Sequence, residues 1–159
     1  MISKRKLGIM LLLSITTSVF VGCSNENTLM KKDTWTVKEL KTQKEIKYEL
    51  LDESVLNESV LNEGEMKSWY EKASKEKGVH SKTDKEYTYI VIADGKKFTT
   101  GYGIELFDVR KVNKEIVVGY NVVEPEKNTS IEEKESYPRM ILRIKAEDGK
   151  IVGKKIKEK

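Results

Sequence analysis

The stretch that decides the fold is Tyr87-Thr88-Tyr89-Ile90-Val91-Ile92-Ala93, a run of β-branched and aromatic residues. Such side chains fit the pleated, half-buried surface of a sheet, so the run predicts a strand. Asp94-Gly95 follows at once, and both residues accept the positive φ angles of a tight hairpin turn. A second strand, over residues 102–112, is therefore expected to pair with the first.

More strand segments are predicted in the rest of the C-terminal half. Residues 116–123 are nearly continuous in apolar side chains, as expected of a central strand, and a proline ends them soon after. A further segment runs over residues 140–144, turns at Glu147-Asp148-Gly149 and returns through residues 151–152. This half is expected to be an antiparallel β unit with an exposed, charged loop over residues 124–136.

The N-terminal half carries weaker strand signals and a duplication. Apolar and polar residues alternate over residues 35–38 and again over residues 46–50, which predicts two half-buried strands. Between these strands and the next element, Ser54-Val55-Leu56-Asn57-Glu58 is repeated at once over residues 59–63. This short period fits neither a helix nor a strand, so the duplication is interpreted as an insertion in a tolerant loop without a function of its own.

One amphipathic helix is predicted over residues 64–77, with Gly78 as its C-terminal cap. Its apolar face consists of Met66, Trp69, Tyr70 and Ala73. Packing of this face against a sheet is favoured over a ligand groove. The elements together predict an α+β, mainly β fold: an antiparallel sheet or a β-sandwich with this one helix.

The N-terminal segment has the three-part build of an export signal. A cluster of three basic residues precedes an apolar run over residues 7–21, and Gly22 stands directly before Cys23. Serine and threonine interrupt the run, which falls short of the roughly 20 apolar residues that a spanning helix needs. Residues 1–22 are therefore expected to be a cleaved signal peptide, which is favoured over a transmembrane anchor.

The end of this run, Phe20-Val21-Gly22-Cys23, resembles the lipobox of bacterial lipoproteins. The resemblance implies that the Cys23 thiol receives a diacylglyceryl group, and two acyl chains give stable membrane attachment. Phe20 departs from the lipobox, which usually has Leu, Val or Ile at that position. The resemblance places the mature protein on the extracytoplasmic face of the cell membrane, with residues 23–34 as a polar, flexible tether.

The length of the mature chain predicts one domain, and its composition predicts a nearly neutral charge. Residues 35–159 are long enough for a single β-rich domain with its own core. The signal segment holds three of the 30 basic residues, so 27 remain against 26 acidic residues. Nucleic acid is an unsuitable partner, because its binders carry a clustered basic excess. Cys23 is the one cysteine, so no internal disulfide can form.

The residues show no arrangement that indicates catalysis. His80 is the one histidine, and it lies in a polar segment that predicts an exposed loop. One histidine without a second cysteine cannot build a zinc site, and neither a nucleophile elbow nor a phosphate-binding glycine loop occurs. The acidic residues mostly stand beside lysines, so no catalytic carboxylate pair can be selected. We expect no cofactor, no metal and no enzyme activity.

The most distinctive segment is Phe98-Thr99-Thr100-Gly101-Tyr102-Gly103. Two glycines around a tyrosine free the backbone, while two hydroxyls and a ring offer adaptable contacts, as in a protein-binding edge. The alternative is structural: the glycines permit a bulge and Tyr102 packs inward. Both interpretations stay open from the residues alone.

These residues resemble the C-terminal domain of the PrcB family, a protease complex subunit found in bacterial exported proteins and lipoproteins. The shared pattern is a strand and glycine turn, a Thr-Gly-Gly-Tyr-like motif, a Val-rich strand ending near a proline, and Tyr-Pro before an apolar strand. Here it covers about residues 87–146 and includes Thr99-Thr100-Gly101-Tyr102 and Tyr137-Pro138. Thr100 stands where the family usually has glycine. The resemblance implies a noncatalytic accessory domain that associates with another exported protein.

Thr99-Thr100-Gly101-Tyr102 also looks like part of the wedge loop of chagasin-like inhibitors of cysteine proteases, which are β-sandwich proteins. The Asn-Pro that opens that loop is replaced by Lys97-Phe98, and Tyr137-Pro138-Arg139 is the one candidate for a second inhibitory loop. This resemblance implies direct inhibition as the alternative function.

The sequence thus predicts a membrane-tethered protein-binding module, with an exported protein, such as a protease, as its partner. The candidate partner-binding residues are Thr99, Thr100, Gly101, Tyr102, Tyr137, Pro138 and Arg139. The basic tail over residues 154–159 has two interpretations: contact with anionic lipid headgroups, or a frayed terminus, which is the commoner case.

Overall fold

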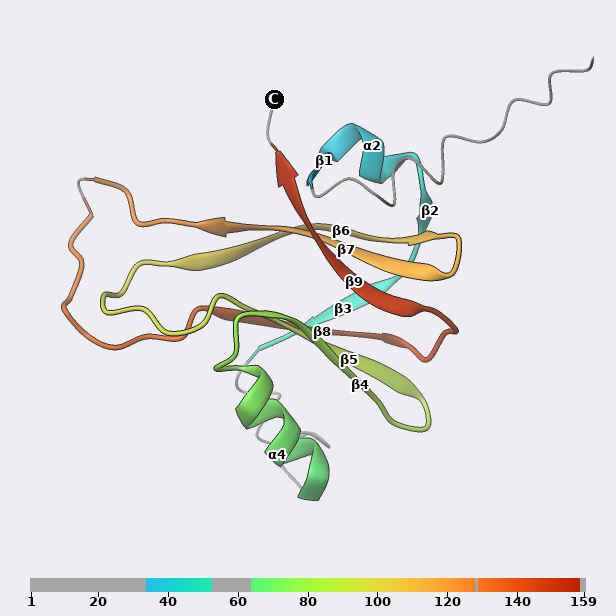
Figure 1. Ribbon diagram of the computed structural model, residues 1–159, viewed down its shortest axis with the longest axis horizontal. Coiled ribbons are helices and arrows are strands. Elements are labelled where there is room, and N and C mark those ends of the chain that lie inside the picture. The colour runs from blue at the N-terminus through green and yellow to red at the C-terminus, as the bar shows by residue number, and fades with distance from the viewer. Residues whose placement is uncertain (1–33, 53–63, 128, 158–159) are drawn as a thin grey trace, which may run out of the picture.

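The computed structural model describes residues 34–52, 64–127 and 129–157, and it shows two packed β-sheets with a helix on each outer face (Figure 1). The mainly β, sandwich-like fold predicted from the sequence is confirmed. Residues 1–22, Cys23, nearly all of the tether and the duplicated segment lie outside the described residues. In the described part, no helix is long and apolar enough to cross a membrane.

The four-stranded sheet is antiparallel throughout. Its order is β3 (Tyr48–Leu51), β8 (Arg139–Lys145), β5 (Tyr87–Ala93) and β4 (Gly78–Thr83). The central strand β5 is buried on both faces, because its side chains alternate between two apolar clusters. This explains why β5 is a nearly unbroken apolar run.

The five-stranded sheet is mixed. Its order is β1 (Thr34–Thr36), β9 (Lys150–Lys157), β7 (Glu115–Val123), β6 (Gly103–Val112) and β2 (Lys44–Glu45). Strands β6 and β7 form an antiparallel hairpin with a register shift between Leu106 and Asp108. Strand β9 runs parallel to both of its neighbours, β7 and β1.

Three apolar clusters hold these layers together. Between the sheets lie Ile46, Ile90, Ile92, Val109, Ile116, Val118, Leu142 and Ile144. Helix α4 (Gly64–Ala73) covers the outer face of the four-stranded sheet, where Met66 and Ala73 join Tyr89 and Val91. The predicted apolar face of this helix is confirmed, with Trp69 and Tyr70 partly buried against the same cluster.

Helix α2 (Val37–Lys41) covers the outer face of the five-stranded sheet. Thr36 and Glu39 form a capping box, in which the Glu39 N–H donates to Thr36 Oγ1 and the Thr36 N–H donates to the Glu39 carboxylate. Leu40 is buried directly over Gly119, where any Cβ would collide with the Leu40 side chain. A glycine on β7 is therefore needed for α2 to lie this close.

The predicted hairpin at Asp94-Gly95 is wrong. Strands β5 and β6 belong to different sheets, and residues 94–102 form a loop that crosses between them. Both edges of β5 are already taken, by β4 and by β8, so the next strand cannot pair there. Gly95 does have the positive φ, 71°, that the sequence suggested. It does not, however, belong to a two-residue hairpin turn.

The predicted return of residues 151–152 onto residues 140–144 is also wrong. The turn at Glu147-Asp148-Gly149 leads from β8 in one sheet to β9 in the other. Strand β9 then pairs with β7 in parallel, so the C-terminal half is not wholly antiparallel. A chain that turns tightly and a chain that changes sheets use the same turn residues.

Several element boundaries also differ from the sequence predictions. Residues 37–38 begin helix α2 instead of continuing a strand. In the second predicted strand, residues 46–50, the alternation of apolar and polar residues predicted that Leu50 faces inward. Leu50 is instead 54% exposed, and its neighbour Leu51 is buried. Helix α4 ends at Ala73, and Gly78 opens strand β4 instead of capping the helix.

Candidate functional site

Two loops meet at one end of the sandwich, at the left of Figure 1. The first, over residues 94–102, connects β5 to β6, and the second connects β7 to β8 over residues 124–138. They carry both groups of predicted partner-binding residues, Thr99 to Tyr102 and Tyr137 to Arg139, the last of which opens β8. The fold thus brings together two segments that are far apart in the sequence.

Backbone hydrogen bonds tie the two loops to each other. Lys97 and Ser136 exchange two bonds, with N···O distances of 2.9 and 3.0 Å. The Thr100 N–H donates to the Glu132 carbonyl at 3.0 Å, and the Glu132 N–H donates to Thr100 Oγ1 at 3.0 Å. The Ser136 hydroxyl donates to the Thr99 carbonyl at 2.7 Å. The candidate residues therefore stand on a braced double loop.

Gly101 is the position where this loop needs glycine. Its φ is +92°, and a Cβ there would lie 2.8 Å from Pro125 Cβ. Thr100, which stands where the PrcB family usually has glycine, is not among the described residues with positive φ. The threonine is therefore accommodated without backbone strain, and its hydroxyl is used to hold the second loop.

Asp94 anchors the start of the first loop. Its side chain is only 4% exposed and lies 2.9 Å from Lys77 Nζ and 2.6 Å from Lys97 Nζ. Its N–H donates to the Pro138 carbonyl at 3.0 Å. Burial alone would raise the pKa of the Asp94 carboxyl, but hydrogen bonds and positive charge from Lys97 and Lys77 outweigh it and hold this pKa below its ordinary value.

Lys97, one of the two lysines paired with Asp94, also contacts the aromatic ring of Tyr102. Its ammonium lies 4.9 Å from the centroid of the Tyr102 ring, within the range of a cation–π contact. One lysine therefore links the buried carboxylate of Asp94 to Tyr102. Tyr102 as a whole is half-buried, so part of this residue faces solvent.

The two loops line an open hollow of about 360 Å³. It is lined by Thr100, Gly101, Tyr102, Gly103, Ser136, Tyr137, Pro138 and Arg139. Six of the seven candidate residues line it, and Thr99 does not. Thr99 instead contributes its carbonyl to the bond from Ser136.

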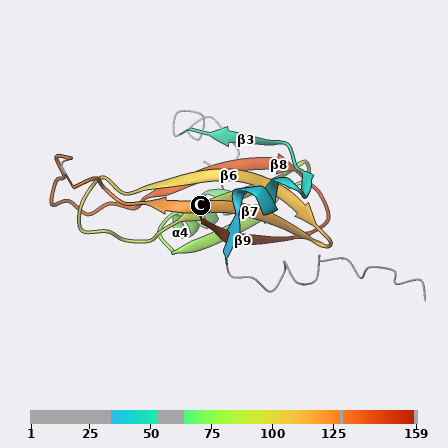
Figure 2. The ribbon, with the colours of Figure 1, turned by 90° about the horizontal axis from the view of Figure 1, so that it is seen from above.

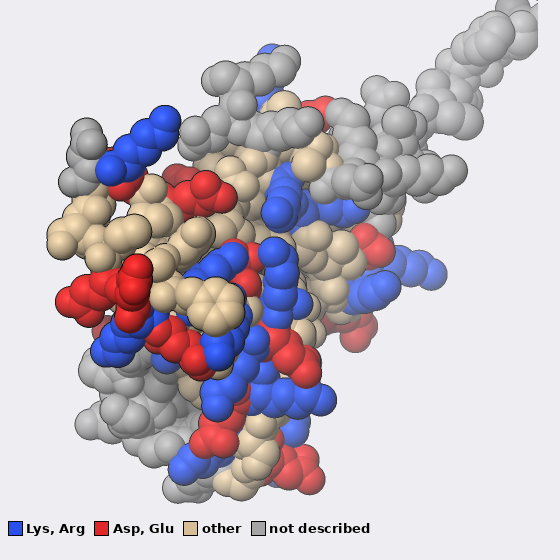
Figure 3. All heavy atoms as spheres, turned by 60° about the vertical axis from the view of Figure 1, so that its left-hand side comes forward, with Lys and Arg blue, Asp and Glu red and all other residues tan. Residues whose placement is uncertain are grey.

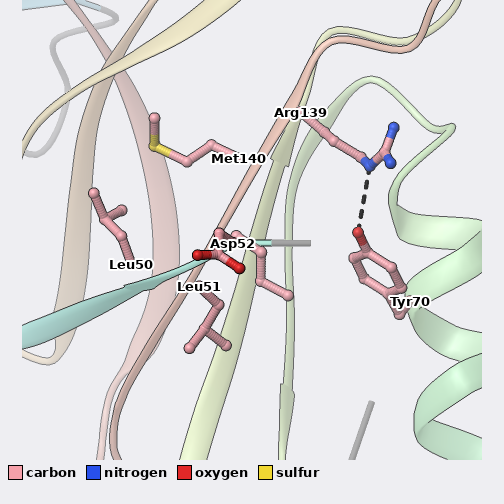
Figure 4. Close-up of a pocket in the computed structure, with 7 residues that line it drawn as sticks. Leu50, Leu51, Asp52, Tyr70, Arg139 and Met140 are labelled. Carbon is pink, nitrogen blue, oxygen red and sulfur yellow. Dashed lines mark hydrogen bonds between the residues drawn. The ribbon is translucent and has the colours of Figure 1, made fainter. Parts of the chain in front are cut away.

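Arg139 links this hollow to two others. Its Nε donates to the Tyr70 hydroxyl at 3.3 Å, and its Nη1 donates to the Tyr137 carbonyl at 3.2 Å. A hollow of about 170 Å³ beside Tyr70 and Tyr137 has almost wholly apolar walls. A larger one, of about 500 Å³, lies where β3 ends, between Leu50, Tyr70 and Met140 (Figure 4).

Residues 88–145 match the family model described as PrcB C-terminal. This confirms the resemblance predicted from the sequence. Comparisons with curated proteins and with solved structures gave no match. The matched segment holds strands β5 to β8 and both loops of the site.

The PrcB-like segment supplies the central strands of both sheets. Strands β5 and β8 lie in the middle of the four-stranded sheet, and β6 and β7 lie inside the five-stranded one. The rest of the chain adds the edge strands, β9 and the two helices. Tyr70 on α4 and Leu50 on β3 thus belong to the neighbouring hollows but not to the matched segment, and the sequence prediction missed them.

The surface of this end carries both signs of charge around uncharged residues (Figure 3). Lys96 forms an ion pair with Glu135, whose carboxylate also accepts a bond from the Tyr137 hydroxyl. Lys96 lies 5.5 Å from the centroid of the Phe98 ring, and Phe98 is 78% exposed. An exposed aromatic side chain beside a polar rim is typical of protein-binding surfaces.

His80 does not lie in a loop, as the sequence predicted, but in strand β4. Its Nε2 is 2.9 Å from the Glu76 carbonyl, so the ring is engaged with the turn after α4. The described residues contain no group of three His, Cys, Asp or Glu side chains arranged to hold a metal ion.

Proposed function

We propose that this chain is a noncatalytic protein-binding module that is held on the extracytoplasmic face of the cell membrane by lipid on Cys23. Its partner is another exported protein, and its role is that of an accessory subunit of a protease complex. The observation that carries the proposal is the braced double loop, which presents Tyr102 and Tyr137 in one hollow within the PrcB-like segment. A rigid loop pair reduces the entropy lost on binding and so favours recognition of a protein partner.

Replacing Thr99, Thr100 and Tyr102 together with alanine is expected to reduce partner capture by about tenfold or more, because aromatic side chains contribute strongly to interfaces. Cells that produce the tethered protein are crosslinked, and exported proteins bound to it are quantified by mass spectrometry. The matched control replaces Tyr48, Ser81 and Thr83, which are exposed on the four-stranded sheet, with alanine. Equal capture by both variants would contradict the binding role of the loop.

Lipid on Cys23 is a separate expectation with its own measurement. Mass spectrometry of the membrane fraction should find a mature chain that begins at Cys23 and carries acyl chains. Cys23→Ser should release the protein from the membrane fraction, because the acyl chains provide stable attachment. An unmodified precursor as the one species found would overturn the tether.

Inhibition of a cysteine protease remains the alternative. The sandwich fold and the adjacency of Thr99–Tyr102 to Tyr137–Arg139 are compatible with a chagasin-like arrangement of two loops. This alternative requires the soluble chain to slow a papain-like protease at stoichiometric concentration. An accessory subunit has no such requirement, so the assay separates the two functions.

A further inference from the structure

The five-stranded sheet has two different edges. At one edge, β1 pairs with β9 as far as Lys157, so the interpretation of residues 154–159 as a frayed terminus is wrong up to that point. At the other edge, β2 covers only the far end of β6, opposite Arg110 and Lys111. Among the described strands, residues 103–106 of β6 pair with β7 alone. We call this segment the open edge.

A bulge marks the place where the chain leaves this edge. The register between β6 and β7 shifts between Leu106 and Asp108. Just beyond the shift, the Ile46 N–H donates to the Val109 carbonyl at 3.0 Å, and the Asp108 carboxylate accepts from the Val109 N–H at 2.9 Å. After Ile46 and Lys47 the chain continues as β3 in the other sheet. The open edge therefore begins where the neighbouring strand crosses away.

The backbone of the open edge offers hydrogen-bonding groups to a further strand. In an antiparallel pair, alternate residues bond to the neighbouring strand, and the residues between them direct N–H and C=O to the opposite side. Within the described part of the chain, no residue outside β7 bonds to the backbone of residues 103–106. These outward groups can bond to an extended chain laid along the edge.

Apolar side chains next to the open edge are only partly covered by the sandwich. Ile104 and Leu106 on β6 pack against the cluster between the sheets but are half-buried. Leu50 on β3 is paired with buried Leu142, so it lies on the face directed toward the five-stranded sheet, yet it is 54% exposed. Met140 on β8 lies on the same face and is half-buried. The apolar layer between the sheets thus continues past the last strand that covers it.

Strand β3 stands beyond β6 at one side of the molecule (Figure 2). Only two residues join β2 to β3, so the row next to β6 lies across from β3. The opposite edges are aligned in the same way, because Val79 of β4 lies directly against Gly153 of β9. A strand added at the open edge would therefore continue the five-stranded sheet and cover Leu50.

The open edge is continuous with the double loop and carries an acidic side chain. Gly103, its first residue, also lines the loop hollow next to Tyr102. Glu105 points away from the layer between the sheets, because it stands between two residues that face this layer. It is exposed and forms no ion pair with any described residue. A basic side chain on an added strand would be attracted to this carboxylate.

We propose that the open edge accepts an extended segment of the partner protein as an added strand. Every second side chain of that segment is apolar and packs on Leu50 and Met140, and the other face carries lysine or arginine opposite Glu105. The backbone of the segment bonds to the open edge, while the adjacent double loop contacts the rest of the partner. That the strand comes from this partner rests on the proposed function, whereas acceptance of such a strand by the edge does not.

The probe is a peptide of six residues that alternates valine and lysine and is blocked at both ends. It is titrated into the isotope-labelled chain from residue 24 onward, which contains every described residue, and binding is followed by NMR. We expect the shift changes to concentrate at residues 103–106, where the outward amides should also exchange more slowly. A peptide with its three valines before its three lysines should bind at least about threefold more weakly, because its apolar side chains cannot share one face.

Two variants test the side chains of the edge. Glu105→Lys should weaken the valine–lysine peptide by about threefold and strengthen a valine–glutamate peptide, because the cross-strand charge pair reverses sign. Leu50→Asn should weaken the valine–lysine peptide by about fivefold or more, because the added strand would bury an amide on its apolar face. The matched control is Glu86→Lys, between β4 and β5, which makes the same charge change at an exposed residue and should bind as the unchanged chain does.

No binding, equal binding of the two peptides, shift changes centred elsewhere, or equal weakening by Glu86→Lys would each overturn the proposal. It would also be overturned if all amides of residues 103–106 in the free chain were as protected as those of β7. The edge would then already be covered by another part of the chain or by a second copy, and sedimentation would distinguish the two. Partner capture is measured separately in cells, so failure of the double loop and failure of the edge are distinguishable.

Discussion

Replacing Trp35 with alanine is expected to lower the free energy of unfolding by about 3–5 kcal/mol, the typical cost of truncating a buried aromatic residue. Trp35 is 1% exposed and lies in the cluster between α2 and the five-stranded sheet. The other members of that cluster are Leu40, Val112, Val117 and Ile156. Loss of the indole leaves a cavity under α2 and removes the buried side chain that β1 contributes to this cluster, in addition to its backbone pairing with β9. Urea denaturation followed by circular dichroism measures the change.

The control for this variant is Phe98→Ala. Phe98 is also a large aromatic residue, but 78% of its surface is exposed, so its loss should change the free energy of unfolding by no more than about 0.5 kcal/mol. Hydrogen exchange adds a local measurement, since amides of β1 and α2 should lose protection before those of β5. A Trp35→Ala variant as stable as the Phe98→Ala variant would contradict the packing described for α2.

Replacing Asp94 with asparagine is expected to destabilise the protein by about 1–3 kcal/mol at neutral pH, because the buried carboxylate accepts from two ammonium groups. The Lys77 side chain is 66% accessible to solvent, so solvent screens its ion pair with Asp94. The loss of stability should therefore fall in the lower part of this range. The loop should also loosen, since Lys97 would no longer be held between Asp94 and Tyr102. Chemical denaturation measures the first effect, and hydrogen exchange at the loop amides measures the second.

The pH dependence of this effect has a defined sign. Folding lowers the pKa of Asp94 below its ordinary value of 3.8, so the carboxylate stabilises the fold above that value. The stabilisation is lost as the pH falls through the lower folded-state pKa. The stability difference between the unchanged chain and Asp94→Asn should therefore shrink in acid. Asp148→Asn, at an exposed position, is the control and should change the free energy of unfolding little at neutral pH. A difference that stays constant into acid would argue against the ionised carboxylate as its cause.

The sequence predicted the strands of this fold better than their partners. Strands β5 to β8 lie where their apolar patterns placed them, because each has to fill the space between packed layers. Which strands pair depends on which strand edges are still free in the folded sheet. The residues near a turn do not carry that information. The turn at Asp94-Gly95 is a case in point: the residues favour a turn, but β4 and β8 already occupy both edges of β5.

Two elements were missed for different physical reasons. Strand β4 is polar because it is an edge strand that contributes little beyond Val79 to the core. Helix α2 is short, and its periodicity over five residues cannot be distinguished from that of a strand. Its capping-box signature, Thr36 followed by Glu39, was nevertheless present in the sequence and would have indicated a helix start.

The candidate site was predicted from its residue types but not from its geometry. Two glycines around Tyr102 and the Tyr137-Pro138 pair marked the loops, and the structure places them in one hollow. The bracing by Asp94 could not be foreseen, since its lysine partners come from different segments. Tyr70 was assigned to the core, and its position beside Arg139 follows only from how α4 lies on the sheet.

The parallel pairing of β1 with β9 has a mechanical consequence. A pull on the chain before Thr34, directed along the strand, loads the pairs from Thr34–Lys155 to Thr36–Lys157 in shear, so that they resist together instead of opening one by one. The indole of Trp35, buried in the same strand, would have to leave its pocket at the same moment. The end of the domain that is closest to the proposed tether is thus joined to the sheet in the geometry that withstands tension best.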